Sequence, residues 1–479
     1  MSKFDYDIGV IGGGAAGLTV SSGAAQLGAK TLLIEKELRL GGDCLHFGCV
    51  PSKTLIHSAR LYHNMKQGKR FGLPEIVPPE VDFKLIAQRI QSVIDIIQVH
   101  DSVERFNNLG VEVKFGSPCF ADEHVVNLNG KRFSAKSWVI ATGSSSASPH
   151  VDALKNISYI TNKEIFSLDH LPQSMIVLGA GPIAIEMAQA FSRLGTKISV
   201  VQRSPQILSK EDKDMADEVM VILKREGVDF YLNATVTTAE ENNFGKRITL
   251  DQDGTTTQLT AETLLLAQGR SPNIDNLGLD TININSTPRG IVVDNRMRTS
   301  HSHIYAPGDI NGSFQFTHAA GYEAGIVISN AIFHLPRKTN TRWMPWCTYT
   351  EPELSSIGMN EKQARIAGVD YSIWTETFQE NDRALAEGEE SGKLKLLLDA
   401  KERPLGVQIL GPRAGDLIGE WIAILNSGMK LSSLAGTIHP YPTLTEINKR
   451  VAGSVISPKI FSPTIKKTLR FLFKLQGNH

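Results

Sequence analysis

The chain has 479 residues, with 50 Lys and Arg against 50 Asp and Glu, so its formal net charge is zero. This balance argues against a nucleic-acid binder, which normally carries a basic excess. Hydrophobic residues make up 41% and charged residues 21%, as in globular proteins, and the length suggests about three domains. No apolar run is long enough to span a membrane and no signal segment precedes the first strand pattern, so we expect a cytoplasmic protein.

A glycine-rich turn follows the first apolar run. Residues 7–11 predict a strand, and the turn with Gly12, Gly14 and Gly17 leads into a helical pattern and a second strand that ends at Glu35. This order is typical of dinucleotide-binding units. Free N–H groups at the start of the helix bind a pyrophosphate, and the acid accepts hydrogen bonds from ribose hydroxyls.

Two cysteines stand five positions apart directly after this unit. Cys44 and Cys49 lie among glycines, and Lys53 follows one helical turn later. In a locally distorted helix the two thiols can form a disulfide, and the helix start and the lysine favour a thiolate. A structural zinc site needs a second ligand pair, which the sequence lacks; two buried free cysteines are the other alternative. We interpret the segment as a redox-active pair.

An amphipathic pattern over residues 84–109 predicts one long helix that Gly110 ends. Its apolar stripe is expected to lie in the core. The stripe consists of Leu85, Ile86, Ile90, Val93, Ile94 and Ile97.

The strand–turn–helix pattern returns after residue 175, with a turn that contains Gly179 and Gly181. Two such units predict two nucleotides, with electrons passing from one to the other. The strand after the second helix ends in Arg203, with Lys210 further on, where a site for NAD carries an acid. Because Arg and Lys pair with a 2′-phosphate, NADPH is favoured over NADH. A plain surface role for Arg203 is the alternative.

Three further apolar runs predict strands that return to these sheets. One ends at Thr142 and Gly143, and another is followed by Gly269. These three residues are further candidates for binding a cofactor. The third enters a turn with Asp309. We expect Asp309 to cap a helix over about residues 317–333.

From about Trp343 the composition changes. Residues 393–398 and 405–410 predict strands of a meander, and residues 413–430 predict a helix. The predicted fold class is therefore α/β, with two doubly wound, Rossmann-like nucleotide-binding domains and a C-terminal α+β domain.

In these motifs the sequence resembles the class I flavoprotein pyridine nucleotide-disulfide oxidoreductases, which include dihydrolipoamide dehydrogenase, glutathione reductase and mercuric reductase. The resemblance extends from Tyr6 to about Val451. It implies a homodimer whose C-terminal domain completes the partner's active site. It also implies three domains: an FAD-binding domain over 1–149 and 278–342, an NAD(P)-binding domain over 150–277, and a dimerisation domain over 343–479.

The resemblance also implies roles for single residues. Cys44 is the thiol that attacks substrate, and Cys49 is the thiol that contacts the flavin. Lys53 lies by the flavin and pairs with Glu186, and Asp309 contacts the FAD. Electrons are expected to pass from NAD(P)H through FAD to the disulfide of the two cysteines.

One position departs from the disulfide-reducing members. They carry a His directly before the C-terminal Pro-Thr, whereas this chain has Tyr441; the Glu that orients the His is kept as Glu446. A phenol with a pKa near 10 is a poor proton shuttle at neutral pH. His439 lies two positions earlier, and we interpret it as a packing residue.

The final acceptor therefore stays open between a disulfide, a metal ion such as Hg(II), and a quinone. Mercuric reductase resembles this chain in having Tyr near this position. The cysteine pair that delivers its metal has no counterpart here after Cys347. A flavoprotein subunit that docks into a multienzyme complex is the alternative function.

The tail over residues 459–479 predicts a short basic amphipathic helix after Pro463. Such a helix can lie on an anionic membrane surface. Packing on its own core or on the dimer interface is the alternative that we favour, because short helices gain most of their stability from packing. The apolar residues are Ile465, Leu469, Leu472 and Phe473, and the basic residues are Lys466, Lys467, Arg470 and Lys474.

Overall fold

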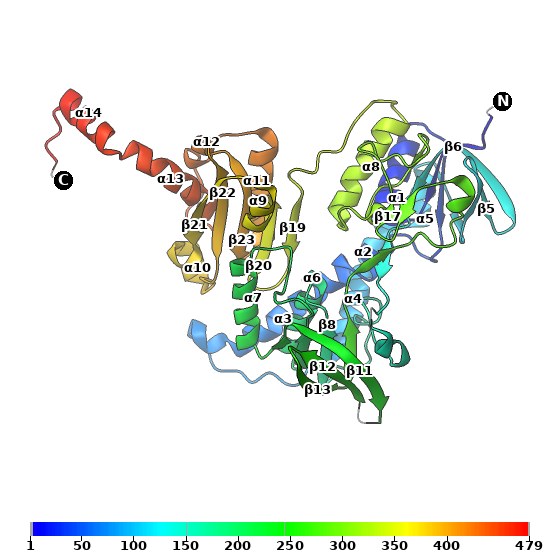
Figure 1. The fold of residues 1–479 in the computed structure, drawn as a ribbon, viewed down its shortest axis with the longest axis horizontal. Coiled ribbons are helices and arrows are strands. Elements are labelled where there is room, and N and C mark those ends of the chain that lie inside the picture. The colour runs from blue at the N-terminus through cyan, green and yellow to red at the C-terminus, as the bar shows by residue number, and fades with distance from the viewer. Residues whose placement is uncertain (1–2, 150, 244, 478–479) are drawn as a thin grey trace. The chain divides into compact units, whose positions relative to one another are not determined.

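The computed structural model describes residues 3–149, 151–243 and 245–477. Residue 150, where the NAD(P) domain was expected to begin, and residues 478–479 of the tail lie outside the described residues. The chain forms two compact units (Figure 1). The first unit comprises Met1–Pro205 and Glu226–Asn340, and the second comprises Gln206–Arg225 and Thr341–His479. Every helix of the described residues is too short or too polar to span a bilayer.

The first unit contains a sheet in the order β3-β2-β1-β6-β5-β4, with β18 beside β6. Strand β1 pairs with β2 and β6, β2 with β3, and β6 with β18, and all four pairings are parallel. The pairings of β4 with β5 and of β5 with β6 are antiparallel. The strands are β1 (Tyr6–Ile11), β2 (Thr31–Glu35), β3 (Val111–Phe115), β4 (Cys119–Asp122), β5 (Val125–Leu128), β6 (Lys131–Ile140) and β18 (Ile304–Tyr305).

Helices α1 (Ala15–Gln26) and α8 (Thr317–Ala331) share a buried cluster with this sheet, as their small residues allow close packing. A Cβ added to Gly23 of α1 would lie only 2.6 Å from Ile328 of α8. Another cluster surrounds the fully buried Trp138 of β6. The central strands are therefore buried on both faces, as is typical of doubly wound sheets.

A second parallel sheet in this unit has the order β10-β9-β8-β14, beside an antiparallel sheet of β11, β12 and β13. Helix α6 (Pro182–Leu194) follows β8 and ends at Gly195, which has a φ of +121°. The strands are β8 (Ser174–Leu178), β9 (Lys197–Val201), β10 (Asp229–Tyr231), β11 (Ala234–Asn242), β12 (Gly245–Gln252), β13 (Thr255–Ala261) and β14 (Thr263–Leu266). Short pairs join β7 (Ser144–Ser146) to β15 (Arg270–Pro272) and β16 (Ser286–Thr287) to β17 (Gly290–Ile291).

The prediction of one long helix over residues 84–109 is wrong. The structure has α4 (Phe83–Gln98) and α5 (Val103–Asn108), separated by a 3₁₀ turn and by Ser102, whose hydroxyl caps α5 by accepting from the N–H of Arg105 at 3.3 Å. The expected core stripe is only partly buried: Ile90 and Ile94 are buried, whereas Leu85 is 63% exposed.

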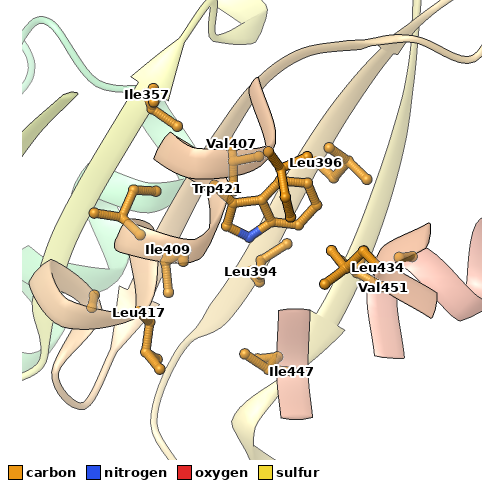
Figure 2. Packing of buried hydrophobic residues seen from close by; sticks show 14 of the residues in the cluster. Ile357, Leu394, Leu396, Val407, Ile409, Leu417, Trp421, Leu434, Ile447 and Val451 are labelled. Carbon is orange, nitrogen blue, oxygen red and sulfur yellow. The ribbon is translucent and has the colours of Figure 1, made fainter. Parts of the chain in front are cut away.

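The second unit is built on the sheet β19-β20-β23-β22-β21. Its core surrounds Trp421 of α11, which Figure 2 shows among Leu394, Leu396, Val407 and Ile409. Truncating such a side chain costs about 3–5 kcal/mol of stability. The strands are β19 (Pro345–Thr348), β20 (Glu353–Gly358), β21 (Tyr371–Thr377), β22 (Lys393–Asp399) and β23 (Pro404–Gly411). The helices are α7 (Lys213–Arg225), α9 (Glu361–Ala367), α10 (Asp382–Glu387), α11 (Ala414–Ser427), α12 (Leu431–Ala435), α13 (Glu446–Ile460) and α14 (Pro463–Phe473).

Buried charges attach the segment 206–225 to the rest of the second unit. The Lys395 side chain on β22 is only 2% exposed, and its ammonium lies 2.9 Å from Asp212, 2.8 Å from Asp214 and 2.5 Å from Glu361. The three carboxylates stand close enough to bind a metal ion. Because the ammonium already lies among them, with Lys393 3.2 Å from Asp214 and Arg365 2.8 Å from Glu361, we interpret the cluster as a structural ion-pair network.

The α/β fold class predicted from the sequence is thus confirmed, including the C-terminal meander and its helix. The assignment of residue ranges to an FAD domain and an NAD(P) domain stays a prediction.

Candidate functional site

The first glycine-rich turn makes a sharp bend between β1 and α1. Gly12 has a φ of +107°, and a Cβ there would lie 2.3 Å from the carbonyl oxygen of Ala141. Helix α1 has neither a side-chain cap nor an acidic residue in its first turn. The buried Glu35 carboxylate accepts a hydrogen bond from the N–H of Gly13 at 2.5 Å. The turn therefore offers backbone donors to a pyrophosphate, with an acid close by.

The other two glycines of this turn allow close approach. A Cβ at Gly17 would lie 1.8 Å from the carbonyl oxygen of Gly12. Gly14 packs on Gly42, where a Cβ would lie 2.7 Å from the Gly14 Cα. The turn thus lies directly against the start of the cysteine segment.

The two cysteines lie on two consecutive helices. Cys44 belongs to α2 (Gly42–His46), and Cys49 is the first residue of α3 (Cys49–Lys66). The break at Phe47 and Gly48 is the local distortion that the sequence predicted. Both thiols are free in this structure, with Cys44 partly buried and Cys49 exposed.

The pKa values of the two thiols are shifted in opposite directions. A hydrogen bond from the Cys44 thiol lowers the pKa of Cys49 to about 6, with help from the Thr317 hydroxyl and the charge of Lys53. The same hydrogen bond, together with burial and the charge of Cys49, raises the pKa of Cys44. At neutral pH the thiolate is therefore on Cys49 and the proton is on Cys44.

Thr317 is a site residue that the sequence analysis missed. It opens α8, and its hydroxyl oxygen lies 3.4 Å from the Cys49 sulfur. Its only signal in the sequence was its place at the start of an expected helix. No local motif links it to a cysteine that is 268 positions away.

Lys53 and Glu186 form an ion pair of 2.8 Å between Nζ and Oε2. Lys53 lies one turn into α3, and Glu186 is nearly buried on α6. The pair therefore connects the cysteine helix to the helix of the second glycine-rich turn. Their roles toward a cofactor stay a prediction.

A polar network includes Asp43 of α2. Arg270 lies 3.0 Å from the Asp43 carboxylate and donates to the Ser144 hydroxyl at 2.7 Å. That hydroxyl donates to Asp309 at 2.6 Å. The expectation that Asp309 caps α8 is wrong: α8 begins after Phe316 without a side-chain cap, because Asp309 opens a separate 3₁₀ turn. Burial raises the pKa of Asp309.

Thr142 and Gly143 lie where the chain leaves the first sheet. Thr142 exchanges two hydrogen bonds of 2.8 Å with Asn273, through its hydroxyl and its carbonyl oxygen. Gly143 has a φ of +68° and accepts from the N–H of Asn273 at 3.0 Å. Gly269 accepts from the N–H of Ala147 at 3.0 Å. These contacts join the segment 142–147, which follows the first sheet, to the segment 269–273, which follows the second parallel sheet.

The second glycine-rich turn repeats the geometry of the first. Gly179 has a φ of +107°, and a Cβ there would lie 2.4 Å from the carbonyl oxygen of Ala267. Gly181 is the N-cap of α6, which lacks a side-chain cap and early acidic residues. Arg203, just after β9, is exposed, and its guanidinium has no carboxylate partner within the described residues. Lys210 belongs to the second unit.

The C-terminal candidates all lie in the second unit. Tyr441 is 71% exposed, and its hydroxyl donates to Asp382 at 2.7 Å, which raises the Tyr441 pKa. Glu446 opens α13 and accepts from the N–H of Thr443 at 3.4 Å. His439 lies 2.9 Å from the Glu420 carboxylate, with most of its side chain covered.

Comparison with known proteins gives two family matches. Residues 6–324 match the family described as pyridine nucleotide-disulphide oxidoreductase. Residues 344–452 match the family described as the dimerisation domain of pyridine nucleotide-disulphide oxidoreductases. Mercuric reductase of Bacillus cereus is 31% identical over 446 residues, which cover 93% of this chain and 70% of that protein. Dihydrolipoyl dehydrogenase of Geobacillus stearothermophilus is 35% identical over 459 residues, which cover 94% of this chain and 96% of that protein.

Among solved structures, the Cu(II) complex of the HOCl-induced flavoprotein disulfide reductase RclA from Escherichia coli superposes with a TM-score of 0.84 at 27% identity. The match covers 94% of this chain and all of that chain.

Proposed function

The chain belongs to the pyridine nucleotide-disulphide oxidoreductase family, and we propose that it uses NADPH to reduce a thiophilic metal ion, Hg(II) or Cu(II), at Cys44 and Cys49. Membership makes it an FAD-dependent oxidoreductase that uses NAD(P)H. The observation that carries the choice of acceptor is Tyr441, which stands where disulfide-reducing members have a His.

The residues of the first unit fit FAD. The Gly12 bend, the uncapped start of α1 and the buried Glu35 bring backbone donors and an acid together at one tight turn, where a Cβ at Gly12 or Gly17 would clash with the chain's own backbone. When bound, FAD supplies the transfer of an electron pair from NAD(P)H to a disulfide. The Lys53–Glu186 ion pair fixes the lysine charge on the side of α3 that faces α6.

The two thiols supply the chemistry for a metal acceptor. Soft thiolate ligands favour thiophilic ions, and the Cys49 thiolate is present at neutral pH and exposed. Binding to the second sulfur releases the Cys44 proton to solvent. Oxidation of one NADPH to NADP⁺ and a proton supplies two electrons, which reduce one Hg(II) to Hg(0) or two Cu(II) to two Cu(I).

Tyr441 disfavours a disulfide acceptor. Reducing a disulfide to two thiols requires proton delivery to the leaving sulfur, and a phenol whose pKa is raised further by Asp382 holds its proton at neutral pH. A metal ion needs no such proton. The names of two relatives agree with this choice, because one is a mercuric reductase and another was solved as a Cu(II) complex.

The preference for NADPH is supported by Arg203. Its guanidinium follows β9, is exposed, and has no carboxylate partner within the described residues, so it is available to a 2′-phosphate.

The match to a dimerisation domain supports a homodimer. We propose that this domain places Tyr441 and Glu446 beside the thiol pair of the other subunit.

The test is steady-state NADPH oxidation with Hg(II), Cu(II), lipoamide, glutathione disulfide and a quinone. We expect turnover with the metal ions that is lost in Cys44→Ser and kept in Cys119→Ser, a matched control because Cys119 is exposed outside the site. The Geobacillus relative makes lipoamide the second candidate. Lipoamide turnover above about 1 s⁻¹, the range of ordinary enzymes, with slow metal reduction would contradict the proposal.

A further inference from the structure

The C-terminal helix α14 stands free of the core of its unit. It begins after Ser462, whose hydroxyl accepts from the N–H of Ile465 at 3.4 Å, and it ends at Lys474, which has a φ of +51°. None of its side chains is buried. Figure 1 shows α14 continuing outward from α13. The expectation that the apolar face packs on the core of its own unit is therefore wrong.

The helix leaves a continuous apolar face in water. Helical spacing places Ile465, Leu469, Leu472 and Phe473 on one arc, and all four are exposed. Contiguous exposed apolar surface with a polar rim is typical of sites that contact a protein or a membrane.

Basic side chains line the flank of this arc. They are Lys466, Lys467, Arg470 and Lys474. Within the described residues no carboxylate pairs with any of them, and Arg470 donates only to the carbonyl oxygen of Gly477 at 2.8 Å. The sequence contains no acidic residue after Glu446, whereas seven basic residues follow it. This segment is therefore strongly basic, although the chain as a whole has a formal net charge of zero.

The basic residues of α14 decide which kind of partner can cover its apolar face. A second copy of α14 packed about a two-fold axis would bring the same basic flank against itself, which is unfavourable. The tail also lies beyond residue 452, where the match to the dimerisation domain ends. An anionic surface with an apolar interior complements both the flank and the arc.

We propose that α14 is a membrane-surface helix that lies on bilayers containing anionic lipid. The apolar arc enters the boundary between headgroups and acyl chains, and the basic residues remain among the headgroups. One short helix binds weakly and reversibly. A dimer presents two such helices, so binding to a vesicle is strengthened by the second attachment.

The test is co-sedimentation of the FAD-loaded full chain with vesicles of phosphatidylcholine that contain 30% phosphatidylglycerol or none. We expect binding only to the anionic vesicles, with release at high salt. A chain that ends at Ser462 and a Leu469→Ser/Phe473→Ser variant should each lose binding, whereas Ile366→Ser, which alters an exposed apolar residue of α9, should not. Lys466→Glu/Lys467→Glu should weaken binding by about tenfold or more, since each basic residue near an anionic surface contributes roughly fivefold.

The NADPH oxidation of these tail variants should remain at the level of the unaltered protein, because none of the altered residues belongs to the redox site. The proposal is overturned if the full chain stays in the supernatant with anionic vesicles, or if the chain ending at Ser462 sediments equally well. It is also overturned if removal of the tail converts a dimer into monomers in light scattering and vesicle binding is absent, because a second copy then covers the face.

Discussion

Replacement of Thr317 by valine should move the proton equilibrium of the active-site thiols. The Thr317 hydroxyl lies 3.4 Å from the Cys49 sulfur and helps to lower its pKa to about 6. A hydrogen bond to a charged group contributes about 1.5–3 kcal/mol, and the exposure of Cys49 places this one at the low end. Since about 1.4 kcal/mol corresponds to one pH unit, we expect the pKa of Cys49 to rise to about 7.

The sign follows from the charge of the thiolate. A lowered pKa means that the thiolate persists down to pH values near 6, so removal of the hydroxyl raises the pH at which reactivity appears. At pH 7 the thiolate fraction should fall from about nine-tenths to about half. Cys44→Ala should raise the pKa further, because the Cys44 thiol is the largest single cause that lowers it.

The assay is the rate of iodoacetamide alkylation of Cys49 in the reduced protein between pH 5 and 9, followed by mass spectrometry. The low-pH inflection belongs to Cys49, because the pKa of Cys44 is raised. Thr317→Ser, which retains a hydroxyl, is the matched control and should keep the original profile. An unchanged inflection in Thr317→Val, or an equal shift in Thr317→Ser, would refute the reasoning.

Three other changes test separate parts of the account. Arg203→Glu should lower kcat/KM for NADPH by roughly tenfold to a hundredfold relative to NADH, the size of a charge-assisted contact; equal losses with both nucleotides would show that Arg203 does not read the 2′-phosphate. Tyr441→His should raise lipoamide turnover, by up to ~10²-fold, and a fall or no change in steady-state assays would argue against the proton-delivery explanation. Lys395→Met should lower the free energy of unfolding of the second unit by about 3–5 kcal/mol, because the buried Asp212 loses its cation while Asp214 and Glu361 keep only Lys393 and Arg365; a urea midpoint equal to that of the unaltered protein would contradict this.

The sequence predicted best what is encoded locally. The bends at Gly12 and Gly179 require positive φ, and both glycine turns appear at the expected strand ends. The spacing of Cys44 and Cys49 required a distorted helix, and the break at Gly48 supplies it. In each case the constraint lies within a few residues of the motif.

Contacts between distant segments could not be predicted in the same way. The partner of Asp309 is the Ser144 hydroxyl, which lies 165 positions earlier in the chain, so the sequence favoured a local capping role that is absent. The helix expected over 84–109 ends early because Ser102 offers a competing cap, a local signal that the hydrophobic period obscured. His439 lies in a loop and pairs with Glu420 of α11, a contact that no sequence motif predicted.

The central claim, that electrons from NADPH reach Cys44 and Cys49, is tested most directly by counting thiols. The FAD-loaded, air-oxidised protein is treated anaerobically with or without NADPH, alkylated after unfolding, and analysed residue by residue. The account predicts that Cys44 and Cys49 are alkylated only after NADPH treatment, whereas Cys119 and Cys347 are alkylated equally in both samples. Equal alkylation of Cys44 and Cys49 with and without NADPH would contradict it.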